Sequence, residues 1–98
     1  MLVEISAETP LFKLGNEGKI KCSLKAGDER AYQIEWYKNE VKLKTNHKFV
    51  LNENHLTIRG LVTNDSGKYE CHIIMDQLKT NKSIFVNVIG KIQNSKIF

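Results

Sequence analysis

The sequence is poor in cysteine, in proline and in long apolar stretches, and each scarcity excludes a class of protein. The 98 residues include two cysteines, Cys22 and Cys71, and one proline. Two cysteines this far apart do not form a zinc site, because such sites use close cysteine pairs or nearby histidines. No run of 18 apolar residues occurs, so we expect no membrane-spanning helix and no direct membrane insertion. The first residues also lack the basic and apolar regions of a signal peptide, which leaves localisation open.

Positive charge and catalytic motifs are equally limited. The formal net charge is +4, and the lysines are scattered rather than grouped. Nucleic-acid binding usually needs a concentrated basic stripe with stacking aromatics, so we expect no nucleic-acid partner. No nucleophile elbow or oxyanion loop accompanies the serines and histidines, so we expect no enzyme and no catalytic residue. The three histidines lie on different predicted segments, and we expect neither a metal site nor a cofactor.

What the chain does contain is typical of one small globular domain. Hydrophobic residues make up 41% and charged residues 27% of the sequence. We assign residues 1–90 to the domain and residues 91–98 to a tail or a linker. Short alternating segments separated by turn signals, without sustained helical periodicity, predict an all-β fold. The strands are expected at residues 3–7, 11–14, 19–25, 32–38, 41–43, 48–51, 55–59, 68–75 and 82–89, with a loop at 76–80.

Two motifs point to a particular sandwich. The first is the series Cys22, Trp36 and Cys71, and the second is Asp65-x-Gly67-x-Tyr69-x-Cys71, which follows Leu56-x-Ile58-x-x-Leu61. Together they resemble the immunoglobulin superfamily over about residues 3–89. The first strand is split at Pro10, which is similar to the intermediate (I-set) type. The resemblance implies an immunoglobulin-like two-sheet Greek-key sandwich with sheets A-B-E-D and A′-G-F-C-C′.

The resemblance also implies structural roles for the framework residues. A Cys22–Cys71 disulfide would lie against Trp36 at the centre of the sandwich, although two buried reduced thiols are the alternative. The Tyr69 hydroxyl is expected to bond to backbone a few residues upstream. Gly67 would permit a tight turn. Asp65 is expected to pair with a cation, for which Lys48 is the best candidate.

Two settings remain open for such a domain. One is the ectodomain of an adhesion molecule or receptor at the cell surface. The other is a cytoplasmic muscle or cytoskeletal array of the titin or myosin-binding protein C type. Retention of both cysteines favours the oxidising compartment. Asn64 and Asn81 each begin an N-glycosylation sequon, and Asn81 is the better candidate because Asn64 adjoins Asp65.

One predicted outer face carries a candidate partner site. Strand alternation directs several large side chains outward from three adjacent strands, where they would become neighbours. The apolar and aromatic members are Tyr37, His72, Ile74 and Phe85, with Glu35 and Glu70 as an acidic rim. The opposite face would carry Lys19, Lys21, Lys25, Thr57 and Arg59, with Lys48 and Val50 at its edge. It is either an ordinary solvated surface or a site for an acidic partner.

The sequence thus predicts a non-catalytic protein-recognition module of a cell-adhesion molecule or receptor ectodomain. Its expected partner is a protein, for example another immunoglobulin-like domain or a second copy of this chain, bound through the face that contains Tyr37 and Phe85. The cytoplasmic structural array remains the alternative.

Overall fold

The structure, a computed structural model, describes residues 3–24 and 32–90. The predicted tail at 91–98, the expected turn after residue 25 and the outward position of Lys25 lie outside the described residues. Ten strands and one short 3-10 helix occur within the described part. They are β1 (Val3–Ala7), β2 (Phe12–Lys13), β3 (Gly18–Leu24), β4 (Gln33–Lys38), β5 (Val41–Lys42), β6 (Phe49–Asn52), β7 (His55–Ile58), η1 (Thr63–Asp65), β8 (Gly67–Met75), β9 (Leu78–Val86) and β10 (Val88–Ile89).

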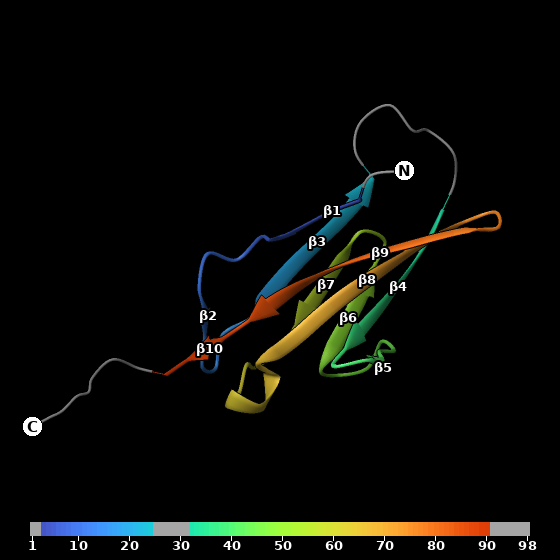
Figure 1. The fold of residues 1–98 in the computed structure, drawn as a ribbon. Coiled ribbons are helices and arrows are strands. Elements are labelled where there is room, and N and C mark those ends of the chain that lie inside the picture. Colours follow the sequence, from blue (N-terminus) through green and yellow to red (C-terminus); the bar gives the residue numbers. More distant parts are fainter. Residues whose placement is uncertain (1–2, 25–31, 91–98) are drawn as a thin grey trace, which may run out of the picture.

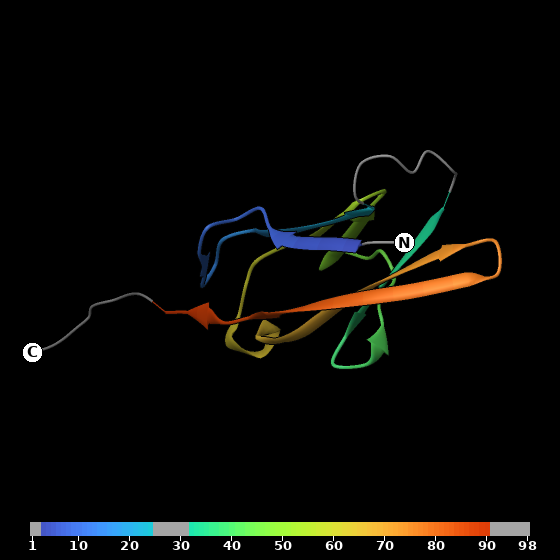
Figure 2. The ribbon, with the colours of Figure 1, turned by 45° about the horizontal axis from the view of Figure 1, so that its top comes forward.

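The strands form two facing layers, so the prediction of an all-β sandwich is confirmed (Figures 1 and 2). One four-stranded sheet has the order β1-β3-β7-β6, and the other has the order β5-β4-β8-β9. β2 and β10 form a short parallel pair, in which Val88 is opposite Phe12. The chain therefore changes sheet between β1 and β2, beside Pro10, because proline cannot donate to a ladder. β1 starts near one end of the sandwich and β10 finishes at the other (Figure 1).

Alternate side chains of each central strand build the core. In β8 every second residue, beginning with Tyr69, is buried, and β3 shows the same alternation around Cys22. Trp36 lies opposite Cys71 in the β4–β8 ladder, and both are essentially inaccessible to solvent. Cys22 and Cys71 are joined by a disulfide between the two sheets, as predicted. The framework is therefore a covalently tied sandwich with its ring and sulfurs at the centre.

The connection after β8 differs from the prediction. A loop was expected at residues 76–80, but Leu78 already lies opposite Met75 in the β8–β9 ladder. Asp76 occupies a turn position with φ 53, a conformation that a short polar side chain tolerates. The hairpin is consequently tight and its strands are nine residues each, and it extends beyond the neighbouring strands in Figure 1. The single expected strand at 82–89 is also divided, because the chain leaves β8 at Asn87 and pairs with β2 instead.

Candidate interaction surface

The residues of the second motif form a buried brace at the start of β8. Asp65 is 4% exposed, and its Oδ2 accepts the backbone N–H of Val62 at 2.8 Å. Lys48 Nζ lies 2.7 Å from the same oxygen and donates to Gly60 O at 2.8 Å. The Tyr69 hydroxyl donates to Asp65 O at 2.6 Å. These bonds connect Lys48, the residue before β6, and Tyr69 of β8 with the segment between β7 and β8. They fix geometry and leave Lys48 unavailable to a partner.

Close packing around the brace explains why position 67 is a glycine and why the pKa of Tyr69 is shifted. Gly67 has φ +152, and a Cβ placed there would lie 2.8 Å from the side-chain amide of Asn39. That amide accepts the N–H of Lys68, so the close approach is a structural requirement rather than a ligand site. Burial, reinforced by the charge of Asp65, raises the pKa of Tyr69 above its ordinary value.

The outer surface of β4, β8 and β9, called the β4–β8–β9 face below, contains the predicted partner residues. The buried side chains of β8 alternate with those at positions 68, 70, 72 and 74, which belong to this face. The pairing registers arrange the face in four rows across the strands. The rows are Gln33–Ile74–Lys79, Glu35–His72–Asn81, Tyr37–Glu70–Ser83 and Lys68–Phe85.

The centre of this face is a closed network rather than an open apolar patch. The rings of Tyr37 and His72 are stacked, with centroids 4.2 Å apart and planes inclined by 30°. The Tyr37 hydroxyl donates to Glu35 Oε1 at 3.0 Å, and Lys42 Nζ donates to Glu35 Oε2 at 3.1 Å. The hydrogen bond from Lys42, followed by that from Tyr37, holds the pKa of Glu35 below its ordinary value. The same bond to Glu35 raises the pKa of Tyr37.

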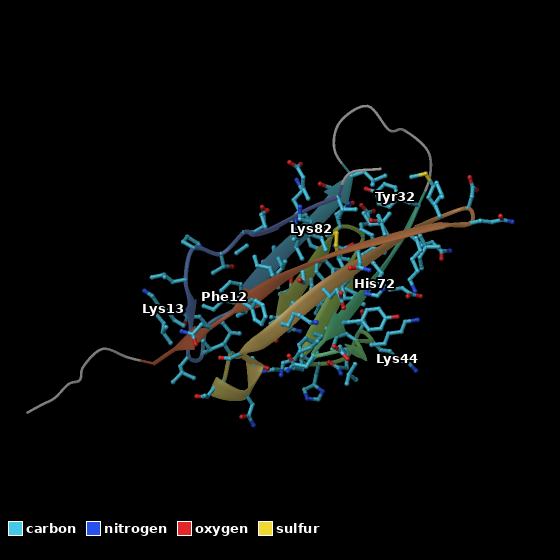
Figure 3. All side chains as sticks on the ribbon, in the orientation of Figure 1. Phe12, Lys13, Tyr32, Lys44, His72 and Lys82 are labelled. Atoms are coloured by element: carbon cyan, nitrogen blue, oxygen red, sulfur yellow. A yellow bond between two sulfur atoms is a disulfide. The ribbon has the colours of Figure 1, made fainter. Side chains whose placement is uncertain are left out.

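His72 lies on β8, the middle strand of this face (Figure 3). Its side chain is 15% exposed, and Nε2 lies 3.3 Å from Glu70 Oε1. That contact has ion-pair distance without hydrogen-bond geometry, so both ring nitrogens are buried without a hydrogen-bond partner among the described residues. The prediction of an outward His72 thus agrees with the register, but the ring is mostly covered.

Phe85 does not adjoin the other aromatics, contrary to the prediction. It lies opposite Lys68, in the row next to that of Tyr37, but β8 lies between the strands of the two rings. The row of His72 is one row further away. Its side chain is 78% exposed, the highest value among the exposed large hydrophobic residues of the described chain. Ile74 is half-buried at the opposite end of the face. The candidate patch is therefore a hydrogen-bonded polar-aromatic centre with one separate, largely exposed ring on the edge strand.

The opposite sheet does not present a uniformly basic surface. Lys21 lies between Ser6 of β1 and His55 of β7, and His55 Nε2 is 3.9 Å from Glu8 Oε1. A hollow of about 430 Å³ is lined by Glu4, Ile5, Ser6, Glu8, Lys21, Ser23 and Lys82, so both charge signs meet there. Lys82 reaches it from β9 (Figure 3). Lys19, Arg59, Thr57 and Val50 therefore belong to a mixed polar face, which favours the solvated interpretation over an acidic partner.

The two sequons lie in different places. Asn64 belongs to η1, and its backbone carbonyl accepts a hydrogen bond from Lys38 Nζ. Ser66, the third residue of this sequon, accepts the N–H of Val88 at 2.9 Å through its hydroxyl. Asn81 is an exposed residue of β9, directly opposite His72. The sequence alone had not shown that Asn81 shares a surface with the partner residues, since this depends on the hairpin register.

The described residues offer no other evident chemistry. Within them, no group of three His, Cys, Asp or Glu side chains is arranged to hold a metal ion. No helix in the part of the chain that the structure describes is long and apolar enough to cross a membrane.

Comparisons with known proteins agree with this framework. A family described as "Immunoglobulin domain" matches residues 3–74. Tyrosine-protein kinase-like otk of Drosophila willistoni is 39% identical over 57 residues, which are 57% of this chain and 5% of that protein. The human cell adhesion molecule DSCAM is 38% identical over 61 residues, which are 58% of this chain and 3% of that protein. The chain thus spans only a small part of these relatives.

A solved structure shows the same architecture at low identity. The titin domain M4 superposes with a TM-score of 0.67 and 18% identity, covering 89% of this chain and 95% of that one. At this identity the likeness establishes the fold alone.

Proposed function

Because this chain belongs to the immunoglobulin domain family, a fold that is generally non-catalytic, we propose that it is a protein-recognition module of a cell-adhesion molecule or receptor ectodomain. The inter-sheet disulfide supports an oxidising compartment, since such bonds are rare in the cytosol. The relationship to a cell adhesion molecule, DSCAM, supports the same assignment. The word kinase in the name of the other relative, otk, describes a whole protein, and this chain matches 5% of its length.

The observation that carries the proposal is the β4–β8–β9 face, with Phe85 beside a pre-ordered centre. An exposed aromatic ring gains free energy when a partner covers it, and aromatic anchors dominate many protein interfaces. The stacked pair of Tyr37 and His72 is already held by Glu35, so a partner that contacts it loses little side-chain entropy. Lys79 and Lys68 supply a polar rim at the ends of the face.

The proposed partner is another sandwich domain, including a second copy of this chain. In a two-fold contact the same surface is used by both copies, so each Phe85 would meet the polar centre of its partner. The charges of this face have both signs, with Glu35 and Glu70 near the centre and lysines at the ends. A centred antiparallel contact would set lysines against lysines and glutamates against glutamates. We therefore propose a contact that is offset along the strands, in which Lys68 and Phe85 of each copy lie over the row of Glu70 in the other, and this favours a defined register.

The alternative is a structural domain in a cytoplasmic muscle or cytoskeletal array. Titin M4 has the same fold, and the fold alone does not separate the two settings. A count of free thiols on protein from its native source distinguishes them. An intact Cys22–Cys71 bond supports the ectodomain, whereas two free thiols would support the array.

The binding proposal is tested by Phe85→Glu. Since the ring is 78% exposed, the change should leave the melting temperature almost unaltered while weakening self-association or partner binding by at least about tenfold. Sedimentation equilibrium measures self-association. Leu11→Glu is the matched control, because Leu11 is also exposed (56%) but precedes β2, outside the face. Normal binding by Phe85→Glu would exclude this face as the interface.

Tyr37→Ala is a weaker test of the binding proposal than Phe85→Glu. Tyr37 is half-buried and stacks on His72, so its removal should also cost about 1 kcal/mol of stability. Tyr37→Phe keeps the ring and removes only the bond to Glu35, which makes it the better variant for binding measurements.

A further inference from the structure

The position of Asn81 connects two features that the sequence left separate. In the β8–β9 ladder Asn81 lies opposite His72, whereas its neighbour Thr80 lies opposite the fully buried Ile73. Asn81 therefore belongs to the β4–β8–β9 face, two residues before Ser83 of the same sequon. Both Asn81 and Ser83 are exposed.

We infer that Asn81 carries an N-linked glycan that covers the β4–β8–β9 face, so that the glycosylated face and the partner-bound face exclude each other. The inference rests on the proposed ectodomain setting and on the proposed partner face. In the modifying step, Nδ2 of Asn81 loses a proton and bonds to C1 of the first sugar. The bond between C1 and the lipid diphosphate donor breaks, and the lipid diphosphate leaves with no change in oxidation state.

The geometry places the glycan over the residues that a partner would contact. Directly opposite residues in a ladder have Cβ atoms about 5 Å apart, so the first sugar would lie beside His72. Phe85 is four residues further along the same face of β9, or about 13 Å at the usual rise of a strand. A bulky surface glycan spans such a distance, so it reaches the anchor ring as well as the centre.

The second sequon provides an internal comparison. Asn64 lies in η1, outside the three strands of the face, so a glycan there would not cover Phe85. Substitution of Ser66 would remove the acceptor of the Val88 N–H, and Asn64→Gln is therefore the appropriate control variant. Ser83→Ala removes the Asn81 sequon and retains the asparagine, without adding a charge to the face.

The modification is tested on the full 98-residue chain secreted from eukaryotic cells. Intact mass is measured before and after digestion with peptide N-glycosidase. We expect a releasable glycan on the wild-type chain and on Asn64→Gln, and a loss of that glycan from Ser83→Ala. The assignment of Asn81 would be overturned if Ser83→Ala released the same mass of glycan as the wild-type chain while Asn64→Gln released less. It would also be overturned if the wild-type chain released no glycan.

The covering of the face is tested without any partner. Hydroxyl-radical oxidation of Phe85 should be at least about twofold slower in the glycosylated chain than in Ser83→Ala, while oxidation of Leu11 should be equal in both. Equal oxidation of Phe85 in both forms would refute the covering.

Sedimentation of the same two proteins separates this inference from the binding proposal. Self-association by Ser83→Ala but not by the glycosylated chain supports both. Equal association of the two forms refutes mutual exclusion. If Phe85 is shielded but neither form associates, the covering by the glycan is supported and a second copy of this chain is refuted as the partner.

Discussion

Tyr69→Phe isolates one hydroxyl of the buried brace and has a calculable cost. The hydroxyl donates to Asp65 O at 2.6 Å, and Tyr69 is 0% exposed. A neutral hydrogen bond contributes about 1 kcal/mol net, and an acceptor left unsatisfied in the interior costs about 1–3 kcal/mol. We expect a loss of about 2 kcal/mol in the free energy of unfolding. For a domain of this size that corresponds to a fall of about 8–16 °C in melting temperature.

The same residue predicts a specific pH dependence. Burial raises the pKa of Tyr69 in the folded state above its unfolded value of about 10. A group with a raised folded pKa stabilises the fold fully below the unfolded pKa and loses that contribution as pH rises toward the folded value. Above pH 10 the wild-type chain should therefore lose about 1.4 kcal/mol per pH unit through Tyr69, a loss that Tyr69→Phe lacks. The two unfolding free energies should converge as pH rises from about 10 to 11.

Guanidinium unfolding at pH 7, 10 and 11, followed by the fluorescence of Trp36, measures both effects. Tyr32→Phe is the matched control, because the Tyr32 hydroxyl is only part-buried and accepts a hydrogen bond from Asn54 Nδ2. In that variant Asn54 Nδ2 keeps its hydrogen bond to Cys22 O. That variant should lose less than about 1 kcal/mol. A constant difference between the wild-type chain and Tyr69→Phe across this pH range would refute the assignment of the linkage to Tyr69.

Two further substitutions test other parts of the framework. Lys48→Met removes the cation beside the buried carboxylate of Asp65, which keeps its bond from the Val62 N–H, and should cost about 2–3 kcal/mol of stability. In denaturant unfolding the double variant Lys48→Met/Asp65→Asn should recover part of this loss. Full stability of the single variant would contradict a structural ion pair. Gly18→Ala would make a Cβ overlap the buried Phe12 ring and should cost about 1–3 kcal/mol of stability. Gly90→Ala is the control, because its Cβ would make only an ordinary contact of 3.5 Å. Equal melting temperatures of these two variants would refute the packing argument.

Much of the fold was predictable because one physical rule decides it. Alternation in β3 and β8 assigns every second residue to the interior, and the Cys22, Trp36 and Cys71 series then orients the two sheets. The bonds of Asp65 and Tyr69 follow from a motif whose spacing is itself imposed by the turn before β8. The alternation and the 65–71 motif are local patterns, and the long-range pairs follow from them through the family resemblance, so both could be predicted from the sequence.

The features that were missed depend on contacts between distant residues. The turn at Asp76 lacks the glycine or asparagine that signals a tight hairpin, so the length of β9 was underestimated. That error concealed the register, and with it the position of Asn81 opposite His72. The packing requirement at Gly18 could not be predicted from the sequence, because it arises only when Phe12 packs over Gly18 from β2.

The composition of β9 determines how a partner can approach. β9 is an edge strand, and a free strand edge invites pairing with another chain. Its exposed residues include Lys79 and Lys82, and charged side chains on an edge oppose such pairing. Phe85, in contrast, projects from the face that also holds the stacked Tyr37 and His72. The proposed recognition is therefore a face-to-face contact between sheets rather than the addition of a strand, and this is why a single glycan on that face would suffice to prevent it.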